Sequence, residues 1–319
     1  MRACCLLLVL LFLTACQPQR DLKLEAPPAD AHTVKVITPD WAVASTLTAL
    51  GYPPIATGDT KSYREWVGTP SLPSDIIDVG ERFTPNFERL AQLTSASNNS
   101  ASNNIVIIDN DFYAHLRPAY GNTPHKSVSF MSKNAVATWQ DYAEPTLQLG
   151  EIIHQPQRAQ QFLTQSKKQL GELGATFRQK YPHIKKIAVV QFADSNNLRI
   201  YTNNSLFRPT FEVMGLNLIT LEDQMGKGNL WGFNSLALGD LAKLDDDTCL
   251  VVVEPFSPML RQELAKNLLW QRLGYGARAE NSSCMAVLAP IWLYGGVSSM
   301  VVFGERLNQA HWLGGKAHG

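Results

Sequence analysis

Short apolar runs alternate along this chain with segments in which apolar residues recur at helical spacing. The elements predicted for the first half are strands at residues 34–37, 75–79 and 105–108 and helices at residues 40–50 and 84–93. Gly51 is placed to end the first helix, and Thr84 with Pro85 is placed to begin the second. Strands and helices that alternate in this way predict a mostly parallel sheet covered by helices on both faces.

One segment, residues 155–181, interrupts this alternation. It has Pro156 near its start, no proline further in and apolar residues at helical spacing, which predict one helix roughly 40 Å long. Pro182 ends the segment. The elements expected beyond it are strands at residues 187–192 and 250–253 and a final helix at residues 298–312.

The expected fold is therefore α/β, with two lobes joined by a single long rigid helix. Its parts are an N-terminal lobe at residues 33–154, the interlobe helix at residues 155–182 and a C-terminal lobe at residues 183–319. A chain of 319 residues is long enough for two lobes with separate cores.

The start of the chain has the pattern of an export signal, residues 1–15. Arg2 is followed by the apolar run 6–13, which is too short to span a bilayer, and then by small residues before Cys16. This ending resembles a bacterial lipobox, in which the cysteine takes up lipid chains; an ordinary signal peptide that ends in cysteine is the alternative. Residues 16–32 carry that cysteine and a polar, proline-rich spacer. We expect a protein tethered by lipid to the periplasmic face of a bacterial membrane.

Composition narrows the possible partners. The chain has 28 lysine and arginine residues together and 28 aspartate and glutamate residues together, and no basic block interrupts it. This balance gives no attraction to nucleic acid or to an anionic membrane surface. We expect a monomer.

Cysteine positions leave one pair for the mature fold. Cys4 and Cys5 lie within the signal and Cys16 is the lipid site, so Cys249 and Cys284 remain. Each stands at the entrance to an apolar run, and neighbouring parallel strands would bring the two together. An oxidising compartment favours a disulfide between them, with two buried thiols as the alternative.

Catalytic and metal-binding motifs are absent from the sequence. It contains no P-loop, no G-x-S-x-G, no H-E-x-x-H and no G-x-G-x-x-G, and its histidines are not at metal-ligand spacing. The three carboxylates at residues 245–247 are consecutive, so they point in diverging directions and predict a solvated turn. We expect neither an enzyme nor a resident cofactor or metal.

Aromatic residues gather instead beside glycine and proline at predicted loop edges. They are Tyr63, Trp66, Trp231, Trp292 and Tyr294, and Arg82 occupies a similar edge before a predicted helix. For any one aromatic residue, core packing is the simpler interpretation, and a surface salt bridge is the simpler one for Arg82. Several aromatics together on loops that follow strands fit a ligand-lining surface better than a core.

The same segments carry a resemblance to a known family. The matching segments are residues 40–41, 47–54, 59–67, 77–82, 85–86, 204–207, 230–232, 269–270, 290–295 and 314–317. In this order they are similar to periplasmic ferric-hydroxamate (ferrichrome-type) siderophore-binding proteins, and the resemblance covers residues 33–317.

The resemblance implies a class III substrate-binding fold with a shallow ligand groove between the lobes. It implies that Arg82 contacts hydroxamate oxygens, that Tyr113 lines the groove, and that the aromatic wall consists of Trp66, Trp231, Trp292 and Tyr294. Hydroxamate oxygens already fill all six positions around iron, so the protein needs no iron ligand of its own. Aromatic faces with one arginine fork suit such a chelate, which has an apolar body and a few partly negative oxygens.

The resemblance also implies delivery of the ligand to an inner-membrane ABC permease. Such proteins dock through one acidic residue on each lobe; Asp240 fits this role in the second lobe, whereas residues 115–118 offer no acid in the first. The alternatives are a same-fold binder of haem, cobalamin or a carboxylate siderophore, and a non-catalytic envelope assembly lipoprotein. An envelope enzyme acting on a polymer would need a pair of catalytic carboxylates, for which the sequence has no candidate.

Overall fold

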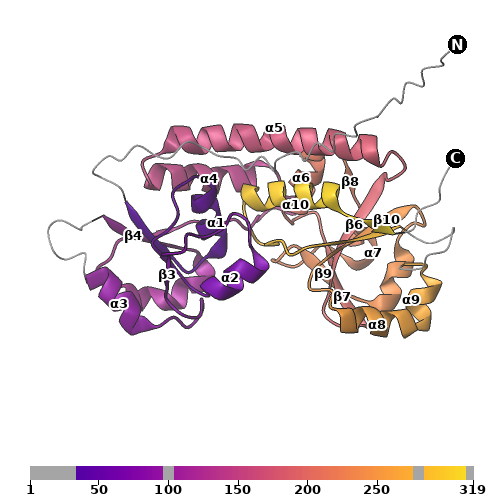
Figure 1. The fold of residues 1–319 in the computed structure, drawn as a ribbon, viewed down its shortest axis with the longest axis horizontal. Coiled ribbons are helices and arrows are strands. Elements are labelled where there is room, and N and C mark those ends of the chain that lie inside the picture. Colours follow the sequence, from indigo (N-terminus) through magenta and orange to yellow (C-terminus); the bar gives the residue numbers. More distant parts are fainter. Residues whose placement is uncertain (1–33, 96–103, 276–283, 314–319) are drawn as a thin grey trace, which may run out of the picture.

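Two α/β lobes lie side by side beneath one long helix in a computed structural model, which describes residues 34–95, 104–275 and 284–313 (Figure 1). The predicted signal, Cys16, the spacer and the matching segment 314–317 lie outside the described residues. No helix within the described ranges is long and apolar enough to cross a membrane. The predicted two-lobe α/β fold is confirmed.

The first lobe is built on a five-stranded, entirely parallel sheet of order β3-β2-β1-β4-β5. Its strands are β1 (Lys35–Thr38), β2 (Ala56–Thr57), β3 (Ile77–Asp78), β4 (Ile105–Asp109) and β5 (His125–Ser127). Its helices are α1 (Trp41–Ala49), α2 (Thr60–Trp66), α3 (Phe87–Ser95) and the 3-10 segment η2 (Asp111–Tyr120). β1 and β4 run centrally in the predicted positions, whereas the predicted strand at 75–79 shortens to two residues.

The start of α3 differs from the prediction at Thr84. Gly80 and Pro85 form a β-bridge, and the amide of Asn86 donates to the carbonyl of Val79 at 2.7 Å, so the chain between them closes into a loop. The helix begins after Asn86, whose side-chain oxygen accepts from the amide of Arg89 at 2.9 Å as an N-cap.

The second lobe contains a seven-stranded mixed sheet of order β12-β11-β10-β6-β7-β9, with β8 paired to β6. Its strands are β6 (Lys186–Phe192), β7 (Asn197–Tyr201), β8 (Asn217–Leu218), β9 (Phe233–Ala237), β10 (Thr248–Val253), β11 (Met285–Leu288) and β12 (Trp312–Leu313). Its helices are α6 (Phe207–Met214), α7 (Glu222–Met225), η3 (Leu238–Lys243), α8 (Pro258–Lys266), α9 (Leu268–Arg272) and α10 (Val297–Gln309). Antiparallel pairs involving β7, β9 and β12 make this sheet less parallel than predicted, and Trp312 belongs to β12 rather than to the last helix.

Helix α5 (Pro156–Lys180) is the predicted interlobe helix, and it packs on α4 (Gln140–Ile152), α6 and α10. Its apolar side, including Phe162, Leu170 and Phe177, belongs to one core that also contains Val106 of the first sheet and Val251 of the second. The expectation of separate cores is therefore wrong on this side. The opposite faces of the two sheets do have their own apolar clusters.

A close approach at Gly296 ties the second lobe to the first. This residue precedes α10, and a Cβ there would lie 2.7 Å from the ring of Phe130 and 2.9 Å from the hydroxyl of Thr46. Only a residue without a side chain fits at this contact. Helix α10 can therefore pack on both α1 and α4 of the first lobe.

A disulfide joins Cys249 and Cys284, with Cα atoms 4.7 Å apart. β10 and β11 pair in parallel with Leu250 opposite Met285, so the residues that precede this pair are neighbours. The register of the strands, which follows from two buried apolar runs, thus brings the two sulfur atoms together.

Removing the disulfide should destabilise the second lobe. In the chain-entropy account a loop closed over a sequence separation of 35 contributes on the order of 4 kcal/mol. Urea unfolding of the Cys249→Ser/Cys284→Ser double variant should show a loss of about that size. Equal stability of the variant and the oxidised parent would contradict this expectation.

Candidate ligand-binding site

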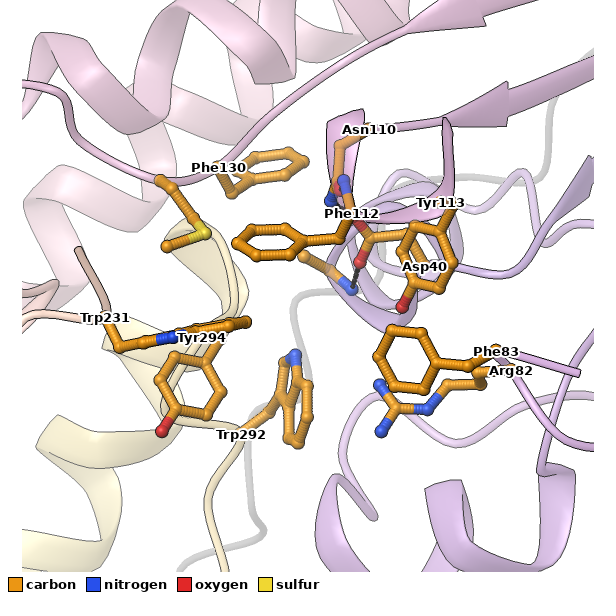
Figure 2. Close-up of a pocket in the computed structure, with 12 residues that line it drawn as sticks. Asp40, Arg82, Phe83, Asn110, Phe112, Tyr113, Phe130, Trp231, Trp292 and Tyr294 are labelled. Carbon is orange, nitrogen blue, oxygen red and sulfur yellow. Dashed lines mark hydrogen bonds between the residues drawn. The ribbon is translucent and has the colours of Figure 1, made fainter. Parts of the chain in front are cut away.

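A pocket opens where the two lobes face each other, and both contribute to its walls (Figure 2). The first lobe supplies Asp40, Ala42, Arg82, Phe83, Asn110, Phe112, Tyr113, Phe130 and Met131, and the second supplies Trp231, Trp292 and Tyr294. Most of this lining is aromatic.

The polar groups reach the pocket because parallel strands end together. Asp40 follows β1, Arg82 follows β3 and Asn110 follows β4, so the carboxyl ends of three strands deliver them to one edge of the sheet. Ligands in open α/β sheets bind at this edge. Trp292 and Tyr294 come from the corresponding connection in the second lobe, between β11 and α10.

Arg82 lies over aromatic rings rather than in a strong ion pair. Its guanidinium carbon is 3.7 Å from the ring centroid of Trp41 and 5.2 Å from that of Trp292. The indole nitrogen of Trp41 donates to the carbonyl of Gly58 at 2.9 Å, which fixes the ring beneath the arginine. Asp59 is 3.8 Å from Nε of Arg82, and the arginine side chain is 17% exposed. The guanidinium is held by cation–π contacts and keeps donors for a ligand.

Asp40 is a buried carboxylate in the pocket wall, only 6% exposed. Its oxygens accept from the amide of Ala42 at 2.7 Å and from the side-chain nitrogen of Asn110 at 2.5 Å. Burial raises the pKa of Asp40 to about 6, although these hydrogen bonds and the charge of Arg82 oppose the rise. Asp40 therefore caps α1 and also places a negative charge beside the pocket.

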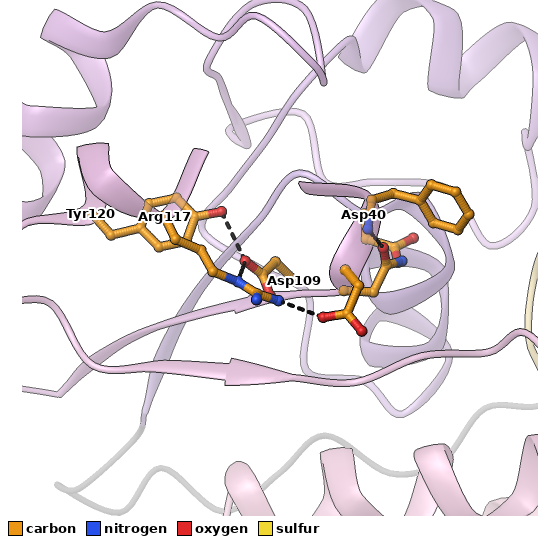
Figure 3. Close-up of polar contacts among 7 residues, drawn as sticks. Asp40, Asp109, Arg117 and Tyr120 are labelled. Atoms are coloured by element: carbon orange, nitrogen blue, oxygen red, sulfur yellow. Dashed lines mark hydrogen bonds and ion pairs between the residues drawn. The ribbon is translucent and has the colours of Figure 1, made fainter. Parts of the chain in front are cut away.

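A second buried carboxylate positions the segment η2. Asp109 is fully buried and accepts two hydrogen bonds from Arg117, at 3.1 and 3.0 Å, and one from the hydroxyl of Tyr120 at 3.2 Å (Figure 3). Arg117 also contacts Asp111 at 3.1 Å. These bonds fasten the C-terminal half of η2 to the end of β4, and the contact with Asp111 ties that half to the start of the segment, which carries Tyr113.

Aromatic stacking closes the pocket across the lobes. Phe112 of the first lobe stacks on Trp231 of the second, with ring centroids 4.4 Å apart, and Phe83 stacks on Tyr113 at 5.2 Å. Trp292 lies edge-on to Tyr294, and its buried indole nitrogen has no hydrogen-bond partner within the described residues. In Figure 2 this nitrogen points into the pocket. Burial raises the pKa of Tyr113, so its phenol stays protonated and can donate.

Five of the six predicted ligand-lining residues meet in this pocket: Arg82, Tyr113, Trp231, Trp292 and Tyr294. Trp66 does not line it. Tyr63 and Trp66, three residues apart on α2, both pack on the cluster around Trp41, behind the pocket wall. Sequence reasoning missed Asp40, Asn110 and Phe112 as pocket residues, although each lies just beyond the carboxyl end of a predicted strand.

Asp240 lies in η3, away from the pocket lining. Its carboxylate accepts from the amide of Ala237 at 2.9 Å and pairs with the ammonium of Lys243 at 2.8 Å. The hydrogen bond from Lys243 lowers the pKa of Asp240, with the amide of Ala237 also contributing, so the residue is an anion at neutral pH. It is 24% exposed and thus partly engaged within its own lobe.

Metal-ligating side chains do not cluster in threes anywhere in the described ranges. The pocket itself offers one carboxylate and one amide, both of which are already hydrogen-bonded to backbone or to each other. Its chemistry therefore suits a bulky ligand with an aromatic-complementary surface and a few acceptor oxygens.

Comparison with known proteins agrees with this geometry. No protein-family model matches the chain. The iron(3+)-hydroxamate-binding protein FhuD of Escherichia coli K12 is 22% identical over 290 residues, which cover 89% of this chain and 88% of that protein. The chain is therefore similar to this hydroxamate-binding protein along most of both lengths.

Solved structures show the same fold. The Fe3+-Desferal-bound FhuD of Vibrio cholerae superposes with a TM-score of 0.71 at 22% identity, over 88% of this chain and 97% of that one. The triscatecholate siderophore-binding protein FeuA of Bacillus subtilis, complexed with ferri-bacillibactin, gives a TM-score of 0.59 at 18% identity, over 88% and 94%.

The buried carboxylate of Asp40 should make stability depend on pH. Its pKa is raised by folding from 3.8 to about 6, so the native state holds the proton more tightly than the unfolded chain. Stability should therefore rise as pH falls through 6, by roughly 1 kcal/mol between pH 7.5 and 5 relative to Asp40→Asn. Urea unfolding of both proteins at the two pH values measures this difference. Parallel pH dependences in the two proteins would contradict it.

Proposed function

We propose that the protein captures ferric hydroxamate siderophores in this pocket and delivers them to an inner-membrane ABC permease. In this proposal Cys16 carries the lipid anchor and the protein works at the periplasmic face of the membrane. The ligand is an intact Fe(III)–siderophore complex, and the protein contributes no iron ligand.

The composition of the pocket carries the proposal. Its lining is aromatic, and Arg82 is the one cation among the lining residues. A ferric trihydroxamate centre is neutral and has partly negative oxygens on an otherwise apolar body. One fixed guanidinium fork, with stacking faces around it, is the complement of that chemistry.

The roles of the other residues follow from their places. Tyr113 and Trp292 can donate to ligand oxygens, the first through its phenol and the second through its unpartnered indole N–H. Trp231 and Tyr294 offer faces from the second lobe. A ligand in the pocket would thus touch both lobes.

The fold alone does not select the ligand class. The FhuD of V. cholerae was solved with Fe3+-Desferal and FeuA with ferri-bacillibactin, a triscatecholate siderophore, and both have this architecture. Selection therefore lies in the side chains of the pocket. The alternatives within the same fold are haem, cobalamin and carboxylate siderophores, and titration of tryptophan fluorescence with a panel of chelates separates them.

Docking to the permease is assigned to Asp240 in the second lobe. Its anionic state and partial exposure agree with such a role, and its pairing with Lys243 means that docking would exchange one cationic partner for another.

Removing the guanidinium tests the ligand assignment. Charge-assisted hydrogen bonds contribute about 1.5 to 3 kcal/mol, so Arg82→Ala should weaken binding of ferrichrome or ferrioxamine B roughly 10- to 150-fold. Arg82→Lys should recover only part of the loss because an ammonium lacks the planar fork. Fluorescence titration gives the affinities, and Arg89→Ala on the exposed side of α3 is the matched control. Binding by Arg82→Ala within about twofold of the parent would refute the assignment.

The anchor is tested separately. Cys16→Ser should release the protein from the membrane fraction, because the thiol that accepts lipid is gone, while ligand binding persists. Cell fractionation and palmitate labelling report the anchor, and fluorescence titration of the released protein reports the site. Continued membrane association together with palmitate labelling of Cys16→Ser would show that the lipid is elsewhere.

A further inference from the structure

The net charge of Arg82 and the two carboxylates nearest to it is negative. Arg82 supplies one positive charge, and the carboxylates of Asp40 and Asp59 supply two negative ones, the second lying 3.8 Å from Nε of Arg82. Asn110 and Tyr113, which also face this region, are uncharged. The guanidinium is therefore more than offset before any ligand arrives.

Hydrogen bonds hold the carboxylate of Asp40 in place beside the pocket. Both of its oxygens accept hydrogen bonds from neutral donors, the amide of Ala42 and the side chain of Asn110. Asn110 is in turn fixed, because its own oxygen accepts from the amide of Phe112 at 2.9 Å. Within the described part of the chain Asp40 forms no ion pair, so its charge is oriented by dipoles and left without a counterion in contact.

We infer that Asp40 determines which charge class of iron chelate the pocket accepts, by repelling chelates whose metal centre is anionic. A ferric tris(hydroxamate) centre is neutral, whereas a ferric tris(catecholate) centre carries three negative charges. A fixed carboxylate at a poorly hydrated site acts on those charges with little screening. The neutral centre loses little from the same carboxylate and gains the hydrogen bonds of Arg82.

This inference rests on the proposed function. It gives Asp40 two separable roles, as the N-cap of α1 and as a fixed negative charge beside the pocket. As the N-cap of α1 the residue could be asparagine or serine, since both side chains cap helices. Neither carries a charge. A purely structural Asp40 therefore predicts no change in charge preference when it is replaced by another capping residue.

The experiment compares the ratio of two affinities, for ferrichrome, which has no charged side group, and for a ferric tris(catecholate), by fluorescence titration at pH 7.5. Asp40→Asn and Asp40→Ser should each shift this ratio at least tenfold toward the catecholate, through tighter binding of the anion. Asp59→Asn removes an equal charge at a side chain that is 34% exposed and outside the pocket lining, so its shift should be smaller. In the asparagine variant, the new side-chain amide could place its NH2 group against the NH2 group of Asn110, which now donates to Asp40. The serine variant has no such group and controls for this effect.

Each outcome is decisive. Unchanged catecholate affinity in both Asp40 variants, or a parent that already binds both chelates equally, would overturn the inference while leaving hydroxamate binding intact. A parent that binds the catecholate alone would refute the proposed function. Failure of all proteins to bind either chelate would overturn both.

Discussion

The packing of α5 across both lobes, in one core shared with the two sheets, is the constraint on which the site depends. One apolar core runs from Val106 in the first lobe through Phe162 and Phe177 of the helix to Val251 in the second. Burial of large apolar side chains contributes about 1.5 to 3 kcal/mol each, so moving one lobe against the other would expose a costly surface. The lobes are held together by this core and by α10, which also contacts both of them. The pocket is consequently formed before a ligand enters.

With the lobes fixed, strand ends decide what the pocket contains. The first sheet delivers a guanidinium, a carboxylate and an amide to one edge, and the facing connection of the second lobe delivers two aromatic side chains. Buried networks then orient these groups: Trp41 supports Arg82, Asn110 holds Asp40, and Asp109 fastens η2. Buried polar groups of this kind are usually hydrogen-bonded. Among the described lining residues, Nε of Arg82 and the indole nitrogen of Trp292 have no hydrogen-bond partner, and a ligand oxygen could accept from them.

Much of this arrangement could be predicted from the sequence where a physical signal is long or repeated. Helix α5 has apolar residues at helical spacing along its whole length, and β4 and β10 are uninterrupted apolar runs, so their predicted places hold. β2 and β8 have two residues each and no periodicity to detect. The loop that carries Arg82 closes through a β-bridge between Gly80 and Pro85. This contact depends on the fold, so the local pattern at Thr84 and Pro85 predicted a helix start there instead.

Predictions of the site residues also succeeded where the sequence signal is local and failed where it is not. Arg82, Trp231, Trp292 and Tyr294 stood out because aromatic and cationic residues beside glycine or proline are informative locally. Trp66 has the same signal, but the short helix α2 turns it toward the cluster around Trp41. Which face a seven-residue helix presents depends on what it packs against, and that information is not local.

The most direct test of a ligand site that spans both lobes is a crystal structure of the mature protein with a ferric hydroxamate, with the iron located by anomalous scattering. The account predicts an iron peak between Arg82 of one lobe and Trp292 of the other, with ligand oxygens in reach of the guanidinium and the lobes in their present orientation. An iron peak outside the pocket lining, or contact with one lobe alone, would contradict it.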